Sequence, residues 1–201
     1  MMLENNNKRA AKVRRTTSET QVTVNLCLDG AGKAAINTGV PFMDHMLELL
    51  AKHGGIDLEL NAVGDLAVDA HHTVEDAGIC LGQAVREALG DKKGIERYGH
   101  ALLPMDESLA AVAVDISGRG CLVFDVPLPA GKVGNFDTEL VEEFLGAFAG
   151  NAALTLHVRL LAGKNTHHII EAVFKGLGRA LRSALEIGDS TGGVPSTKGV
   201  L

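Results

Sequence analysis

The 201-residue chain is poor in aromatic side chains and carries no excess of positive charge. It has no Trp, one Tyr and six Phe, which argues against a stacking platform for single-stranded nucleic acid. Its formal net charge of −6 argues against binding to a phosphate backbone. No apolar run approaches the roughly 18 residues needed to cross a bilayer. The sequence therefore predicts neither a nucleic-acid partner nor a membrane partner.

Cysteine is also scarce. Cys27, Cys80 and Cys121 are odd in number, far apart and without a Cys-x-x-Cys spacing, so reduced thiols in a cytoplasmic protein are expected rather than a disulfide framework. The first 15 residues are basic, but no apolar segment follows them, and we expect no secretory signal. Residues 1–12 are predicted to form a flexible tail.

The most informative pattern that is present is His-His-x-x-Glu, which occurs twice. It begins at His71 and again at His167, and nine of nineteen positions are identical between residues 71–89 and 167–185. Such self-similarity indicates an internal repeat. We therefore predict a tandem duplication, with a first repeat over 13–95, a second repeat over 96–190 and a C-terminal tail over 191–201.

Hydrophobic periodicity predicts the same order of elements in both halves. Alternation predicts strands over 20–28, 34–36, 57–63 and 66–68, and helical spacing predicts helices over about 41–55 and 70–89. The second half repeats this order, with strands over 107–116, 121–126 and 154–160 and helices over 139–148 and 166–186. The expected fold class is α+β, in which each half is a small sheet with two helices on one face.

The repeated motif has the chemistry of a metal site. Residues three or four apart share one helix face, so a His and the Glu of one motif can bind the same ion, whereas adjacent His side chains point about 100° apart and can serve different ions. Matching the shorter helices at an offset of 98 places Glu143 opposite His45. Imidazole and carboxylate without thiolate suit Mn, Fe, Zn or Ni. The candidate ligands are His45, His71, His72, Glu75, Glu143, His167, His168 and Glu171.

Other segments predict a site for an anion. Basic side chains next to turns, and a tail rich in Gly, hydroxyl groups and Lys, offer donors that suit a phosphate group. These residues are Arg97, Arg119, Lys175, Ser196, Thr197 and Lys198. His53, at the end of a predicted helix, is a further candidate for substrate contact.

Four of these runs together resemble one enzyme family. Residues 42–47 (FMDHML), 69–76 (DAHHTVED), 167–172 (HHIIEA) and 195–199 (PSTKG) resemble the imidazoleglycerol-phosphate dehydratases of histidine biosynthesis, in order and in spacing. The resemblance extends from about residue 13 to residue 201.

The resemblance implies a lyase that removes water from D-erythro-imidazole-glycerol phosphate to give imidazole-acetol phosphate. It implies two Mn²⁺ ions per active site, sites at subunit contacts of a 24-subunit homo-oligomer, and halves that resemble domain 2 of ribosomal protein S5. It also implies that the eight candidate ligands bind metal, that Glu19, Glu171 and His71 act in catalysis, and that Glu19, His45, His53 and the anion-site residues contact substrate.

Three positions depart from the family pattern. Glu143 replaces a frequent His, Leu49 replaces a frequent Gln, and Ala70 replaces a frequent Asp. None of these changes removes a core ligand. Two alternatives remain open from the sequence: another dinuclear-metal lyase on the same scaffold, and a non-catalytic metal-binding shell protein.

Overall fold

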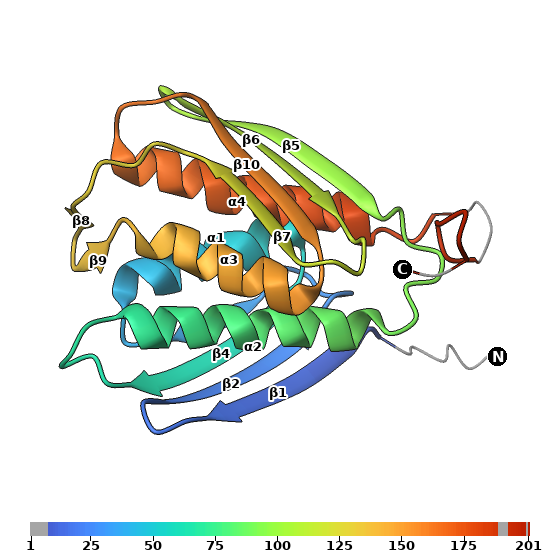
Figure 1. The fold of residues 1–201 in the computed structure, drawn as a ribbon, viewed down its shortest axis with the longest axis horizontal. Coiled ribbons are helices and arrows are strands. Elements are labelled where there is room, and N and C mark those ends of the chain that lie inside the picture. The colour runs from blue at the N-terminus through green and yellow to red at the C-terminus, as the bar shows by residue number, and fades with distance from the viewer. Residues whose placement is uncertain (1–7, 189–192, 200) are drawn as a thin grey trace.

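The computed structural model describes residues 8–188, 193–199 and 201, and consists of two halves with the same order of elements (Figure 1). The first half contains β1 (Ala10–Thr16), β2 (Thr20–Cys27), β3 (Ala34–Asn37), α1 (Pro41–Gly54), β4 (Asp57–Gly64) and α2 (His71–Leu89). The second contains β5 (Tyr98–Met105), β6 (Ser108–Asp115), β7 (Cys121–Asp125), α3 (Leu140–Ala152), β10 (Thr155–Ala162) and α4 (Thr166–Leu185), with the short strands β8 (Lys132–Val133) and β9 (Phe136–Asp137) before α3.

Both halves build the same four-stranded sheet. The strand orders are β1-β2-β4-β3 and β5-β6-β10-β7, and only the last pair in each sheet is parallel. The registers also match, because Val24 pairs with Leu60 in the first sheet and Val112 pairs with Val158 in the second. The expected α+β fold of two similar halves, each a mostly antiparallel sheet, is confirmed.

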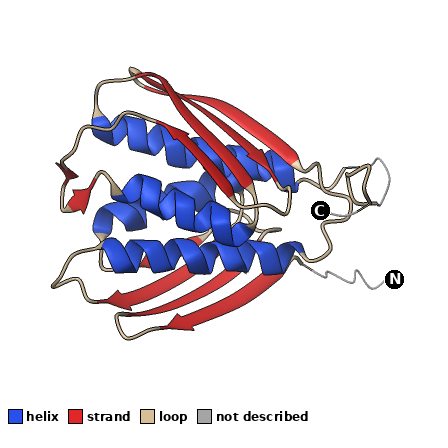
Figure 2. Ribbon diagram, viewed as in Figure 1, coloured by secondary structure: helices blue, strands red, loops and turns tan. Residues whose placement is uncertain are grey.

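The two halves pack through their helices. Figure 2 shows the four helices between the two sheets, and α2 packs on α3 while α1 packs on α4. Each sheet therefore covers the helices with its inner face, where the buried side chains of the core lie. The outer faces of both sheets are not covered by the described part of this chain.

Two glycines of the repeat allow the helices to approach closely. A Cβ at Gly82 would lie 2.6 Å from the carbonyl oxygen of Phe148, and a Cβ at Gly178 would lie 2.7 Å from that of Leu50. These glycines are equivalent in the two copies of the motif. The repeat thus preserves the contact between helices of different halves as well as the two His-His-x-x-Glu motifs.

The ends of the helices follow local sequence signals. Pro41 begins α1, where its missing N–H is not needed, and Gly55 ends it with a left-handed φ of 68°. Asn165 caps α4, because its side chain accepts hydrogen bonds from the backbone N–H groups of His167 and His168. Both histidines of the second motif are therefore fixed to the first turn of a capped helix.

Several elements differ from those that the sequence predicts. Strand β1 begins at Ala10, inside the segment expected as a tail, of which residues 1–7 lie outside the described residues. Strand β5 is absent from the predicted elements, and so is the β8–β9 hairpin. The expected strand at 66–68 is a turn, closed by a hydrogen bond from Val68 N to Asp65 O. The expected boundary after residue 95 falls in the connection between α2 and β5.

Candidate functional site

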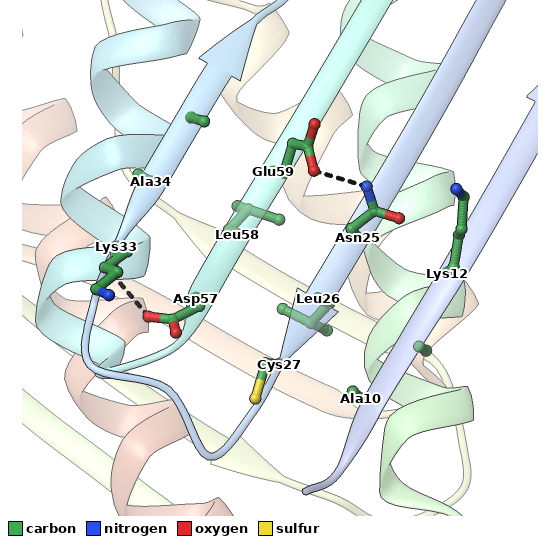
Figure 3. A pocket seen from close by; sticks show the side chains of 12 residues that line it. Ala10, Lys12, Asn25, Leu26, Cys27, Lys33, Ala34, Asp57, Leu58 and Glu59 are labelled. Carbon is green, nitrogen blue, oxygen red and sulfur yellow. Dashed lines mark hydrogen bonds between the residues drawn. The ribbon is translucent and has the colours of Figure 1, made fainter.

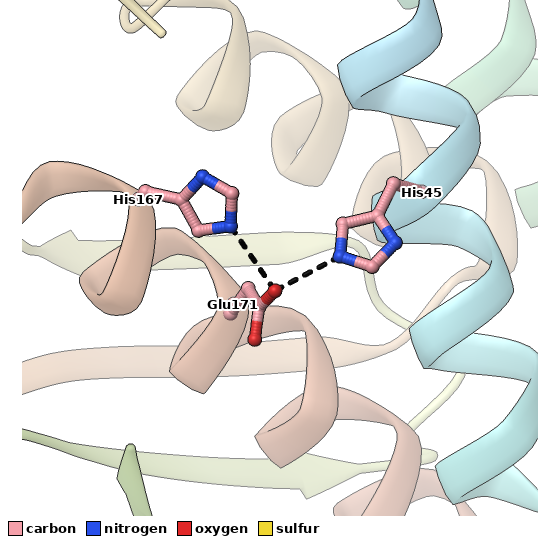
Figure 4. Close-up of side chains that lie close together, drawn as sticks. All are labelled: His45, His167 and Glu171. Atoms are coloured by element: carbon pink, nitrogen blue, oxygen red, sulfur yellow. Dashed lines mark hydrogen bonds and ion pairs between the residues drawn. The ribbon is translucent and has the colours of Figure 1, made fainter. Parts of the chain in front are cut away.

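Three of the candidate ligands lie together between α1 and α4 (Figure 4). Nε2 of His45 lies 2.9 Å from Oε1 of Glu171, and Nε2 of His167 lies 3.1 Å from the same oxygen. One ligand atom from each of the three residues falls within 4.8 Å of the others. Two imidazoles and one carboxylate form a donor set that suits a divalent transition metal.

The carboxylate at the centre of this cluster is buried and yet ionised. Burial alone would raise the pKa of Glu171, but hydrogen bonds from Lys175, His45 and His167 outweigh it and lower the pKa to about 2. Nζ of Lys175 donates to Oε2 at 2.5 Å. A buried charge is tolerated where such partners compensate the lost hydration. The cluster therefore holds a ready anionic oxygen at neutral pH.

The first motif lies at the start of α2 and has a different environment. Nδ1 of His72 lies 3.0 Å from Oδ2 of Asp65 and 3.9 Å from Oε2 of Glu19, which stands in the turn between β1 and β2. His71 begins the helix, and its backbone N–H donates to Asp69. Among the described residues, His71, His72, Glu75 and Glu143 do not form a ligand group as tight as that around Glu171.

In the motif at the start of α4, His168 has contacts similar to those of His72. Nδ1 of His168 lies 2.7 Å from Oε2 of Glu107. The rings of His167 and His168 are nearly perpendicular, at 86°, and those of His71 and His72 are at 87°. His167 thus contacts Glu171 while His168 contacts Glu107. The two histidine rings of this motif therefore contact different carboxylates, as the helical geometry predicts.

The predicted anion-binding residues form a separate pocket of about 890 Å³. Arg97 is fixed there by Asp115, at 2.7 Å from its Nε, and its Nη1 donates to the carbonyl oxygen of Pro195 at 2.9 Å. Arg97 thereby anchors the C-terminal segment. The pocket is lined by Arg97, Tyr98, Ser117, Gly118, Arg119, Pro195, Ser196, Thr197, Lys198 and Leu201. Of the expected tail, residues 191, 192 and 200 lie outside the described residues.

The anion pocket and the metal cluster are at opposite ends of α4. The N–H of Arg97 donates to the carbonyl oxygen of Ala184, whereas Glu171 lies near the start of the helix. At 1.5 Å per residue, these two points on α4 are about 20 Å apart. Lys175 belongs to the cluster end, since it binds Glu171 rather than lining the pocket. His53 also lies outside the pocket lining.

His53 occupies the end of α1, next to α4. Burial lowers the pKa of its ring, and the nearby charges of Lys175 and Arg179 lower it further. Both effects favour the neutral form of the ring. Of the departures from the family pattern, Leu49 packs against the core, and Ala70 precedes α2 without a side-chain cap.

Sequence reasoning missed Asp65 and Glu107, the carboxylates that hold His72 and His168. The internal repeat contained one signal, because the offset of 88 between the segments 19–28 and 107–116 aligns Glu107 with Glu19. Asp65 had no such signal. It comes close to His72 only because the turn at 65–68 folds back on α2.

Comparisons with known proteins agree on one family. A sequence model described as imidazoleglycerol-phosphate dehydratase matches residues 38–181. The imidazoleglycerol-phosphate dehydratase of Desulforudis audaxviator is 65% identical over 193 residues, covering 96% of this chain and 98% of the relative. That of Desulforamulus reducens is 64% identical with the same coverage.

Solved structures give the same result. The crystal structure of imidazoleglycerol-phosphate dehydratase from Staphylococcus aureus is 48% identical, with a TM-score of 0.80 over 89% of this chain and 99% of that chain. The Pyrococcus furiosus enzyme in complex with (S)-C348 is 41% identical, with a TM-score of 0.81 over 94% of this chain and 100% of that chain.

Proposed function

Because this chain belongs to the imidazoleglycerol-phosphate dehydratase family, it is a lyase of histidine biosynthesis, and we propose which of its residues carry each part of the dehydration. The reaction removes a weakly acidic C–H proton and a hydroxyl group. It therefore needs groups that hold the imidazole ring, groups that move protons and groups that hold the phosphate.

The cluster of His45, His167 and Glu171 is the observation that carries the proposal. Its two imidazoles and its ionised carboxylate are ligands that suit a divalent cation. The ligand types and the charge of the carboxylate are therefore already those that a metal site needs. We assign Mn²⁺, two ions per active site, with His71, His72, Glu75, Glu143 and His168 as the remaining ligands. When bound, the ions supply Lewis-acid activation of the substrate ring.

Proton transfer is assigned to Glu19, with Glu171 and His71 as the other candidate catalytic groups. Glu19 has a half-exposed side chain in a turn and lies 3.9 Å from His72. It is thus close to a proposed metal ligand and open to a substrate. A carboxylate in this position can accept the C–H proton and return a proton to the departing hydroxyl.

The phosphate of the substrate is assigned to the pocket around Arg97. Arg119 and Lys198 bring positive charge to this pocket, and Ser196 and Thr197 bring hydroxyl donors. A phosphate group binds well to such charge-assisted donors. His53 and Lys175, which do not line this pocket, are assigned to the cluster end of the substrate.

Assembly follows from the distance between the two ends of α4. A small phosphate ester cannot reach from Glu171 to a pocket about 20 Å away along the helix, so each site takes its phosphate donors from another chain. The outer faces of the sheets offer surface for such contacts. Figure 3 shows part of the outer face of the first sheet, where Asn25 on β2 donates a hydrogen bond of 2.8 Å to Glu59 on β4 in the lining of a pocket of about 590 Å³. We propose the 24-subunit homo-oligomer.

The experiment that tests this function is turnover by metal-stripped protein before and after Mn²⁺ is restored. We expect no ketone product from imidazoleglycerol phosphate without metal, and full turnover once two Mn²⁺ per chain are bound. Glu19→Gln is expected to bind both ions and lose turnover. Near-normal turnover of Glu19→Gln with both ions bound would contradict the role of Glu19.

Localisation is part of the same proposal. Among residues 8–188, 193–199 and 201, no helix is long and apolar enough to cross a membrane. The three cysteines are free, which is typical of proteins in a reducing compartment. We infer a cytoplasmic enzyme on the basis of its thiols and of the pathway.

A further inference from the structure

The second histidine of each motif is held by a carboxylate, but the two carboxylates come from different places in the repeat. Nδ1 of His168 contacts Glu107, at the start of β6, and Nδ1 of His72 contacts Asp65, after the end of β4. Because Nδ1 is engaged in both rings, Nε2 is the nitrogen left for another partner. The two halves thus reach the same arrangement by different residues.

The register of the sheets identifies which residues are equivalent. Since Val24–Leu60 corresponds to Val112–Val158, β2 and β6 are related by an offset of 88, and Glu107 is the counterpart of Glu19. In the second half this carboxylate is 2.7 Å from the histidine. In the first half, Oε2 of Glu19 lies 3.9 Å from Nδ1 of His72, and the side chain of Glu19 is half exposed. Glu19 has therefore been released from a contact that Glu107 keeps.

The loops that precede α2 and α4 explain why carboxylates from different places hold the two histidines. A Cβ at Gly64 would meet Thr73 and Thr20, and one at Gly163 would meet the equivalent Ile169 and Ser108, so these glycines correspond. The loop that follows this glycine spans residues 65–70 in the first half but only residues 164–165 in the second. The longer loop has room to bring its own carboxylate, Asp65, to the histidine.

In the second half the short loop depends on Glu107 instead. Oε1 of Glu107 accepts hydrogen bonds from the backbone N–H groups of Lys164 at 3.2 Å and Asn165 at 2.7 Å. The same carboxylate therefore holds the loop, the first turn of α4 and the ring of His168. Both of its oxygens are therefore engaged in hydrogen bonds within the chain.

We propose that Asp65 and Glu107 are positioning residues, which fix the ring orientation and the protonated nitrogen of His72 and His168, and that Asp65 thereby frees Glu19 for the substrate. The proposal rests on the ligand set assigned above. A carboxylate that accepts the second N–H of a metal-binding histidine sets its tautomer and increases its basicity. Oδ1 of Asp65 is buried without a hydrogen-bond partner in the described part of the chain, and an unpaired buried acceptor lowers the stability of the fold.

The test is Mn²⁺ binding to the full-length, metal-stripped protein, measured by calorimetry, together with the absorption spectrum of the Co²⁺-loaded protein as a report on coordination. We expect Asp65→Ala and Glu107→Ala to weaken Mn²⁺ binding by about 10- to 100-fold and to change the Co²⁺ spectrum. Asp65→Asn and Glu107→Gln keep an acceptor oxygen and are expected to recover part of the affinity. Glu19→Gln is expected to keep the parent affinity and spectrum while turnover falls.

Asp125→Asn is the matched control, because it removes a carboxylate that, within the described part of the chain, pairs with Arg159 alone, on the outer face of the second sheet. It should bind Mn²⁺ like the parent. If Glu107→Ala fails to fold, since Glu107 also holds the loop, Glu107→Gln and the Asp65 variants decide the question.

Two results would each refute a different part of the proposal. Parent-like affinity and Co²⁺ spectra in both Asp65 variants and in Glu107→Gln would refute the positioning role. Parent-like Mn²⁺ binding in His72→Asn and His168→Asn would refute the ligand set itself. Weakened binding in the histidine variants alone leaves the ligand set standing and removes only the inference on Asp65 and Glu107.

Discussion

The charge of Glu171 is stable because its surroundings replace the water it loses. Its side chain is 9% exposed, and Lys175, His45 and His167 all contact it. Removing one partner of a buried charge is usually more costly than the pair itself is favourable. A metal ion would take over the contacts of both histidines. The lysine therefore matters most when no ion is bound.

A second residue-scale consequence concerns the thiols. Burial raises the pKa of Cys80 to about 11, and the side chain is buried on α2, whereas Cys121 is exposed at the start of β7. At pH 8 only about one thousandth of a thiol with that pKa is thiolate, compared with about a quarter at an ordinary pKa. We expect iodoacetamide to modify Cys121 in the native protein and to leave Cys80 intact.

Mass spectrometry of the peptides checks this prediction, with denatured protein as the control in which all three cysteines react. Cys80 labelled as fast as Cys121 would contradict the buried thiol. If iodoacetamide left Cys121 unmodified in the native protein and modified it after denaturation, the exposure of Cys121 would be contradicted. Such a result would indicate that another chain covers β7.

At the scale of the elements, a change from glycine to alanine is expected to destabilise the protein where two helices touch and to stabilise it where the helix surface is free. Alanine favours a helix over glycine by about 1 kcal/mol, but a Cβ at Gly82 or Gly178 would overlap the backbone of the neighbouring helix. Overpacking of this kind costs about 1–3 kcal/mol. We expect Gly82→Ala and Gly178→Ala to lower the free energy of unfolding, as measured with denaturant on metal-free protein.

Gly150→Ala on α3 is the control, since a Cβ there would have no heavy atom within 4 Å. It is expected to raise the free energy of unfolding slightly. If Gly82→Ala raised it as well, the close approach of α2 and α3 would be wrong.

The helices were predictable from sequence because their apolar spacing is strong, whereas the edge strands β1 and β5 were not. β1 alternates basic with small or apolar residues, and β5 contains Gly99 and Pro104. Both are edge strands, where charge and proline are tolerated, so their pattern resembles that of a loop. The turn at 66–68 was read as a strand because Leu66 and Val68 alternate, although both are exposed.

The site was predictable to the extent that its residues lie on those helices. The motif spacing places His167 and Glu171 on one face of α4, and the structure adds His45 from α1. Contacts across the chain, such as those of Asp65, follow from loop paths that no periodicity encodes.

At the scale of the whole molecule, α4 separates the two parts of the proposed active site. The ligand cluster is at its start and the anion pocket is at its end. Two variants that damage different ends should therefore complement each other. We expect His45→Asn and Lys198→Ala each to be inactive alone, and a co-expressed mixture to recover about a quarter of the parent turnover, because each site takes its two ends from randomly chosen chains of a symmetric assembly.

Assays of the separately purified variants and of the co-purified mixture check this prediction. Separately assembled variants that are mixed only afterwards are the control and should stay inactive. A co-expressed mixture without activity would mean that one chain supplies both ends of a site.

The length of α4 then has a genetic consequence. A cell with two defective copies of this gene, one altered near His167 and the other near Lys198, would grow without added histidine, although neither copy alone supports growth. Two alleles altered at the same end would not rescue each other. Alleles altered in the His45–His167–Glu171 cluster and alleles altered in the pocket around Arg97 would therefore form two complementation groups, one for each end of α4.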